Sequence, residues 1–369
     1  MATIEKHRPG KDKTAQPRYQ ALAAELRSQI LRRELVAGDR LPSFAELRAR
    51  HGATPTTAER VYGLLEQEGL VERRQGSGTY VLERKKALTG NIGYIGSEIS
   101  GERLNPFRAL LMAGVYREID KQDRHLLYMG NDHNLKIDAV EKVDGVLICN
   151  IEDTASVIAQ LPAELPRVSL LNVAQDTISV VADDVGAARR AVETLLELGH
   201  RRIACLMEKL PSLPRKRLTG YYDAMLGAGI DPDPRWVKLL KTVPPAVGLE
   251  QPYLDWARYE MRDWIASGWK ELGCTAIVVQ NEQAAIGVLQ VLQEAGGKVP
   301  QDVSVIGFDG TEMCEMMIPR LSTMQLPLAE IGAKGVQILT HLIEGGESQT
   351  QTIVLPVYLR ERDSIAPPQ

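Results

Sequence analysis

The chain is 369 residues long, 44% hydrophobic and 25% charged, which predicts two or three globular domains rather than one. Its formal net charge of -4 conceals an asymmetry, because residues 1–86 carry 17 lysines and arginines against 11 aspartates and glutamates, whereas the remainder is acidic; a basic segment on an acidic body is typical of a local nucleic-acid contact surface. No run of about 18 apolar residues occurs, the N-terminus lacks the apolar region of a secretion signal, and the four cysteines are far apart, so we expect a cytoplasmic protein with reduced thiols and no transmembrane helix.

Residues 17–84 begin with three segments of helical pattern. Apolar residues recur at helical spacing from Tyr19 to Ile30, which predicts an amphipathic helix. A second helix is predicted after Ser43, which forms a capping box with Glu46. A third is predicted from Thr54, since a threonine followed by proline at the first helical position is a strong start signal. Two short helices meeting at a tight turn predict a helix-turn-helix.

Two β-prone segments, 70–74 and 79–81, follow the helices and are joined by a glycine-rich tip. The whole stretch from Pro17 to Val81, including Gly38-Asp-Arg-Leu-Pro-Ser43 and the run from Glu66 to Val81, resembles the DNA-binding domain of the GntR family. The resemblance implies a winged helix-turn-helix that binds double-stranded DNA. The second helix of the helix-turn-helix, which is the third helix of the domain, would enter the major groove, and the hairpin tip would approach the DNA backbone.

The DNA-contacting surface departs from the family at three places. Ala45, Pro55 and Glu59 stand where the resemblance implies base-reading arginines, so we do not expect a family operator sequence, because each arginine–guanine pair contributes about 1–3 kcal/mol of discrimination. The candidate DNA-contacting residues are Arg48, Thr54, Thr56, Thr57, Arg60, Arg73, Arg74 and Gly76.

After a connector at 85–90, buried β-prone runs alternate with helical stretches through residues 91–369. This alternation predicts parallel sheets covered by helices on both faces. Ligands in such folds bind beyond the carboxyl ends of the strands. Asn172, Asn281 and Asp309 each follow a predicted strand and fall at such positions.

The body resembles the effector domain of LacI/GalR-type repressors, which is itself similar to type I periplasmic sugar-binding proteins. The motifs that carry the resemblance lie at 183–204, 217–221, 296–309, 319–323 and 360–364. It implies two lobes crossed three times by the chain, lobe 1 at about 91–184 and 326–355 and lobe 2 at about 185–325 and 356–369. The combination of a GntR-type N-terminal domain with a LacI-type body is similar to the architecture of arabinose-responsive repressors.

The resemblance implies that Arg217 donates to ligand oxygens and that Asp309 accepts from ligand hydroxyls, a pairing that suits a polyol. The region from Trp236 to Trp269 departs from the family pattern and holds all four tryptophans, so an aromatic residue there is a candidate for stacking on a sugar, with a place in the core as the alternative. The candidate ligand-binding residues are Ser97, Asn172, Arg217, Tyr253, Trp256, Asn281 and Asp309.

These features predict a homodimeric, ligand-responsive repressor that binds a palindromic operator and a small-molecule effector, expected to be a sugar. We expect no catalytic residue, metal or organic cofactor, and no membrane contact. Four alternatives remain open: a regulator with a non-sugar ligand or none, a DNA-binding domain that has lost sequence specificity through Ala45, Pro55 and Glu59, a sugar-transport receptor, and a GntR-type head fused to a pyridoxal-phosphate enzyme. The last is disfavoured because LacI-type motifs cover the 283 residues after Lys86.

Overall fold

The computed structural model describes residues 18–31, 34–74, 76–82, 88–96, 106–131, 134–149, 151, 153–208, 213–240, 252–347 and 349–369. The chain forms two compact units, 1–87 and 88–369, here called the head and the body. Within the described residues, no helix is long and apolar enough to cross a membrane.

The described residues of the head form three helices and a two-stranded antiparallel sheet. These are α1 (Arg18–Leu31), α2 (Phe44–His51), α3 (Pro55–Gln67), β1 (Val71–Arg74) and β2 (Gly78–Val81). Both halves of the predicted capping box are present at Ser43, and Thr54 caps α3 as expected. Leu47, Val61 and Leu65 are fully buried between the helices, so the head has a core of its own.

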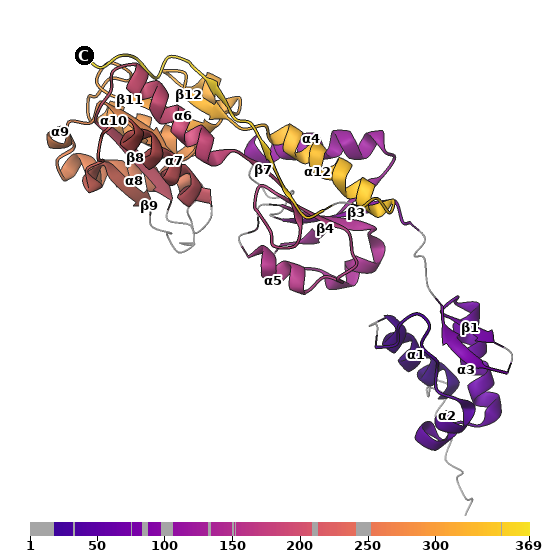
Figure 1. Cartoon of the computed structure of the whole chain (residues 1–369). Helices are drawn as coiled ribbons and strands as arrows, with labels where there is room; N and C mark the ends of the chain where they lie inside the picture. The colour runs from indigo at the N-terminus through magenta and orange to yellow at the C-terminus, as the bar shows by residue number, and fades with distance from the viewer. Residues whose placement is uncertain are drawn as a thin grey trace, which may run out of the picture. The chain divides into compact units, whose positions relative to one another are not determined.

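The body contains two six-stranded sheets, each of which defines a lobe (Figure 1). The sheet of lobe 1 is parallel throughout and has the order β13-β7-β6-β5-β3-β4. Its strands are β3 (Asn91–Gly96), β4 (His125–Gly130), β5 (Gly145–Cys149), β6 (Arg167–Leu170), β7 (Ile178–Ala182) and β13 (Thr352–Leu355).

Helices cover both faces of the sheet in lobe 1. These are α4 (Pro106–Lys121), the 3-10 helix η1 (Ile137–Lys142), α5 (Thr154–Ala159) and α12 (Leu328–Ile343). Figure 1 shows α4 and α12 side by side over one face, where they bury Ile92, Leu147 and Leu170. The alternate residues Ile95 and Ile148 point to the opposite face, beside η1 and α5. Because both faces are covered, the inner strand β5 is apolar and buried along its whole length.

The sheet of lobe 2 has the order β14-β12-β11-β10-β8-β9, with only β14 antiparallel to its neighbour. Its strands are β8 (Ile203–Glu208), β9 (Val237–Leu240), β10 (Ala276–Val279), β11 (Ser304–Asp309), β12 (Ser322–Gln325) and β14 (Tyr358–Arg360). Its helices are α6 (Asp184–Glu197), α7 (Leu213–Gly227), η2 (Pro234–Trp236), α8 (Pro252–Ala266), α9 (Trp269–Leu272), α10 (Glu282–Glu294) and α11 (Met313–Met316). Helices α6 and α7 pack together on one face, and α8 and α10 pack together on the other.

The chain passes between the lobes three times, from β7 to α6, from β12 to α12 and from β13 to β14. The alternation of strands and helices thus gives the parallel, doubly covered sheets predicted from the sequence. In lobe 2, β8, β10 and β11 run parallel, so their carboxyl ends share one edge of the sheet. This edge positions Asp309, the last residue of β11.

Candidate DNA interface and effector site

The start of α3 is shaped by threonines. The Thr54 hydroxyl accepts from the Thr57 backbone N–H at 3.2 Å, and the two side-chain hydroxyls lie 2.9 Å apart. These two candidate DNA contacts therefore support the helix end and each other. Thr56 is exposed on the same turn.

The remaining basic candidates stay at the surface of the head. Arg48 on α2 is exposed, and the exposed guanidinium of Arg60 lies 5.8 Å from the ring centroid of Tyr19. At the hairpin, Gly76 has a φ of +73°, which a residue with a side chain adopts only with strain. Arg74 bonds to Glu72, within its own strand.

Arg73 has partners that the sequence analysis did not anticipate. Its Nη1 donates to the Glu59 carboxylate, its Nη2 donates to the Glu59 carbonyl at 3.2 Å, and its Nε lies 3.1 Å from Glu66. Both glutamates belong to α3, whereas Arg73 lies on β1. The guanidinium is thus held against α3 by two carboxylates.

Arg217 is the centre of a polar cluster at the carboxyl edge of lobe 2. The side chain is 2% exposed, and its Nε donates to Asp184 at 2.8 Å while its Nη1 donates to the Gln280 carbonyl. The guanidinium also lies 4.2 Å from the centroid of the Phe308 ring. Its Nη2 has no hydrogen-bond partner in the described part of the chain, since Asp309 Oδ1 is 3.9 Å away. One buried donor is therefore unused.

Asp309 ends β11 in an unusual backbone conformation, with a φ of +88°. Burial raises the pKa of its carboxyl to about 7, against the lowering effect of Arg217. A ligand hydroxyl between Arg217 Nη2 and Asp309 would accept from the first and donate to the second. The geometry of this pair suits a group that does both, as a polyol hydroxyl does.

The other described ligand candidates have partners of their own within the body. Asn281 caps α10 by accepting from the Ala284 N–H at 2.9 Å, and Asn172 donates to the Ile151 carbonyl at 2.6 Å. Tyr253 and Trp256, in the first turns of α8, form an edge-to-face pair with ring centroids 5.5 Å apart. The buried Trp256 Nε1 has no hydrogen-bond partner among the described residues. Ser97 lies outside the residues that the structure describes.

Glu282 is a site residue that the sequence analysis missed. It is 2% exposed and accepts from the Thr311 N–H at 3.0 Å, from the Thr311 hydroxyl at 2.6 Å and from Cys314 Sγ at 3.4 Å. It thereby ties the start of α10 to the loop that follows Asp309. Asp184 was also missed, although it lies within a motif that carried the resemblance; only the fold shows which side chain it contacts.

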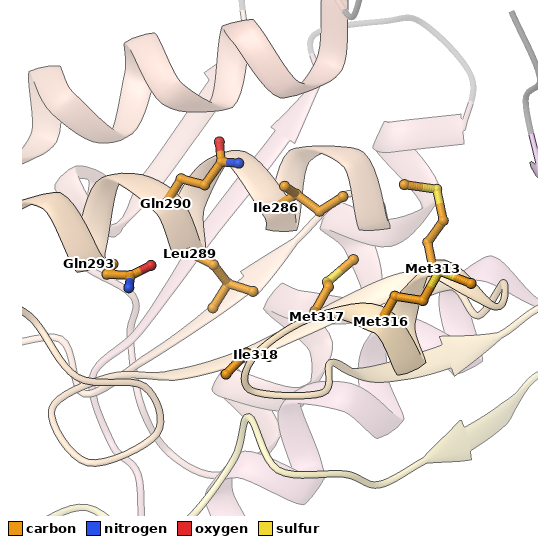
Figure 2. Close-up of a pocket in the computed structure, with 8 residues that line it drawn as sticks. All are labelled: Ile286, Leu289, Gln290, Gln293, Met313, Met316, Met317 and Ile318. Carbon is orange, nitrogen blue, oxygen red and sulfur yellow. The ribbon is translucent and has the colours of Figure 1, made fainter.

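An apolar groove of about 310 Å³ lies between α10 and the segment that contains α11. Figure 2 shows residues of α10 facing the methionine-rich segment across this groove. Met316 is 77% exposed and Ile318 is 95% exposed. We call these lining residues the apolar groove; they are Ile286, Leu289, Gln290, Gln293, Met313, Met316, Met317 and Ile318.

Three family models match the chain. The model of bacterial regulatory proteins of the gntR family matches residues 18–81. The model of periplasmic binding proteins and the sugar-binding domain of the LacI family matches 100–244, and that of the periplasmic binding protein-like domain matches 192–365. Together they account for the head and most of the body, as the sequence motifs had predicted.

Curated relatives and solved structures give the same result for the body. The HTH-type transcriptional regulator DegA of Bacillus subtilis is 28% identical over 302 residues, covering 76% of this chain and 83% of the relative. The ribose operon repressor of Escherichia coli K12 is 29% identical over 272 residues, covering 70% and 78%. A LacI family transcriptional regulator from Enterococcus faecium, crystallised with bound ribose, superposes with a TM-score of 0.63 at 26% identity, covering 75% of this chain and 99% of that one.

Proposed function

We propose that this chain, which joins a DNA-binding domain of the gntR family to a periplasmic-binding-protein-like domain of the LacI type, is a transcriptional repressor whose operator affinity changes when a small polyol binds in the body. The observation that supports a small-molecule site in the body is the pair formed by Arg217 and Asp309. A buried donor without a partner and a buried carboxyl lie 3.9 Å apart at the edge where such folds bind ligands.

The chemistry of the site favours a neutral sugar. Arg217 is already paired with Asp184, and Asp309 and Glu282 add further carboxyls around it. A phosphate or carboxylate on the ligand would meet these groups at close range, whereas hydroxyls use both the free donor and the acceptor. Trp256 Nε1 offers a further donor and Tyr253 an aromatic face. D-Ribose is the first sugar to test, because two of the relatives are named for ribose or hold it.

The proposed switch is closure of the two lobes. A sugar held by lobe 2 would be covered by lobe 1, with Asn172 and Ser97 as candidate contacts from that side. Closure changes operator affinity only if the sugar binds the closed state more tightly than the open one. A 100-fold preference supplies about 2.7 kcal/mol of coupling.

The dimer that a palindromic operator requires is proposed to form through the apolar groove. An exposed surface rich in methionine and isoleucine is costly for a monomer and typical of an interface. Ile318→Glu would then weaken self-association in analytical ultracentrifugation. An unchanged dimer constant would place the interface elsewhere on the chain.

The role is proposed to be non-catalytic and to be carried out in the cytoplasm, where the operator lies. The curated relatives are named as regulators of transcription. The head candidates Arg48, Thr56, Arg60, Arg74 and Gly76 are proposed to contact the operator, with Thr54 and Thr57 setting the start of α3.

A thermal-shift and calorimetric screen of the full chain tests the proposal. The screen uses D-ribose, other pentoses and hexoses, sugar phosphates and nucleosides. A sugar at 100 times its dissociation constant adds about 2.7 kcal/mol to the stability of the body. We expect the shift in the wild type and in the control Asp223→Asn, an exposed position on α7, and no shift in Asp309→Asn. A shift that survives Asp309→Asn would place the ligand elsewhere, and no shift with any sugar would contradict the sugar class.

A further inference from the structure

Glu59 is an acidic residue in the N-terminal half of α3, the second helix of the helix-turn-helix. In a helix-turn-helix, the N-terminal residues of the second helix contact base edges in the major groove. Glu59 is the fifth residue of α3, and its side chain is 56% exposed. An acidic group so close to phosphates is unfavourable by itself, so its presence there calls for a compensating charge and a use.

Arg73 supplies the compensating charge and fixes the side chain. It donates to Glu59 Oε1 and to the Glu59 carbonyl, and its Nε lies 3.1 Å from Glu66. The guanidinium therefore grips both the side chain and the backbone of the residue. The bond from Arg73 Nη1 goes to Oε1, and the side chain remains 56% exposed, so the carboxylate offers a positioned acceptor to the solvent.

We infer that Glu59 reads a cytosine in the operator, with Arg73 as the residue that positions it. A carboxylate only accepts hydrogen bonds. In the major groove, guanine presents two acceptors and thymine one, and both repel a carboxylate. Adenine presents a donor beside an acceptor, whereas cytosine presents its N4 amino donor alone. Glu59 thus favours a C·G pair with the cytosine on the contacted strand.

This inference rests on the proposed function, because it requires that the head bind a specific operator. It also changes the expected role of Arg73. A guanidinium already paired with two carboxylates has little charge left for a phosphate, and its contribution is to hold the orientation of Glu59.

The test is selection from a randomised duplex library with the full-length wild type, Glu59→Gln, Glu59→Ala, Arg73→Met and Glu66→Ala. We expect one position in each half-site at which the wild type selects C·G. Glu59→Gln should select A·T there, because a glutamine amide pairs with adenine N6 and N7. Glu59→Ala should lose selection at that position alone. A mismatch there should cost the wild type about tenfold in affinity.

The controls separate selection of a base by Glu59 from a general effect of charge on DNA affinity. Glu66→Ala removes the other carboxylate of the same arginine near the far end of α3, and should leave the selected sequence unchanged. Arg73→Met should weaken the C·G preference at the Glu59 position while preserving the others. The melting temperature of each variant excludes loss of the fold.

Two results would overturn the inference. If Glu59→Ala changes affinity for all sequences equally, or keeps the C·G preference, Glu59 forms only a surface ion pair. If the wild type itself selects no sequence, operator binding fails, and the wild-type arm alone shows this.

Discussion

The head and the body each contain an arginine within 4.0 Å of two acidic side chains, in opposite surroundings. Arg73 in the head is 33% exposed, and its partners Glu59 and Glu66 are about half exposed. Arg217 in the body is 2% exposed, as is its partner Asp184. Water screens the first cluster, so its ion pairs contribute about 0–1 kcal/mol. The second lies in a medium of low dielectric constant, where removing one partner leaves a charge that nothing solvates. The same combination of groups is therefore proposed to serve recognition in one place and stability and ligand binding in the other.

The largest expected effect is that of Arg217→Met. It leaves Asp184 buried without its cation and should destabilise the body by about 3–5 kcal/mol. Urea unfolding followed by tryptophan fluorescence measures this, because all four tryptophans belong to lobe 2. Adding Asp184→Asn should restore part of the loss, since it removes the stranded charge. No loss in the single variant would mean that water reaches the cluster.

Glu282→Gln comes next and tests whether the buried site is a connected network. A glutamine amide has one acceptor oxygen, so either the Thr311 N–H or the Thr311 hydroxyl would lose its acceptor, and the loop after Asp309 would be held less firmly. We expect a loss of about 1–3 kcal/mol in body stability and weaker sugar binding. Thr311→Val should have a similar effect, and the double variant should cost less than the sum of the two. Strict additivity would contradict the contact.

Sugar affinity should depend on pH through Asp309. Because burial raises the pKa of this carboxyl to about 7, the acceptor that binds a hydroxyl is lost as pH falls below that value. Affinity measured by calorimetry should fall by up to about tenfold per pH unit between 7 and 5.5. A flat profile over that interval would remove Asp309 from the site.

His200 gives a smaller pH effect on body stability. Its ring lies 2.8 Å from the Thr275 hydroxyl and 2.9 Å from the Ala366 carbonyl, and burial lowers its pKa below the ordinary value. The unfolded chain then binds a proton that the native chain does not, so stability is lost as pH falls through about 6.5. The raised pKa of Asp309 acts in the opposite direction, so melting should be compared in the Asp309→Asn background with and without His200→Gln. Identical slopes in the two would contradict the assignment.

The smallest effect is expected for Glu66→Ala in the exposed cluster. The change should alter the stability of the head by no more than about 0.5 kcal/mol, because the ion pair is screened and the position is exposed. Differential scanning calorimetry of the head transition measures it. A loss of several kcal/mol would mean that the exposed Arg73 cluster stabilises its domain as strongly as the buried Arg217 cluster.

Local sequence determined most of the architecture. Ser43 with Glu46, and Thr54 with Pro55, mark helix starts through contacts within four residues, and the apolar runs separated by helical stretches mark parallel strands. Such signals depend on near neighbours in the chain. The fold class and the two family resemblances therefore follow from the amino-acid sequence alone.

The tertiary structure decided which side chains meet. Arg73 and Glu59 are 14 positions apart, and Arg217 is 33 positions from Asp184 and 92 from Asp309. The sequence marked Arg73 as a candidate DNA contact, and only the packing of β1 against α3 shows its two acidic partners, Glu59 and Glu66. Spacing along the chain fixes helices and strands, but the partner of a charged side chain depends on which elements pack together and on how much water remains between them.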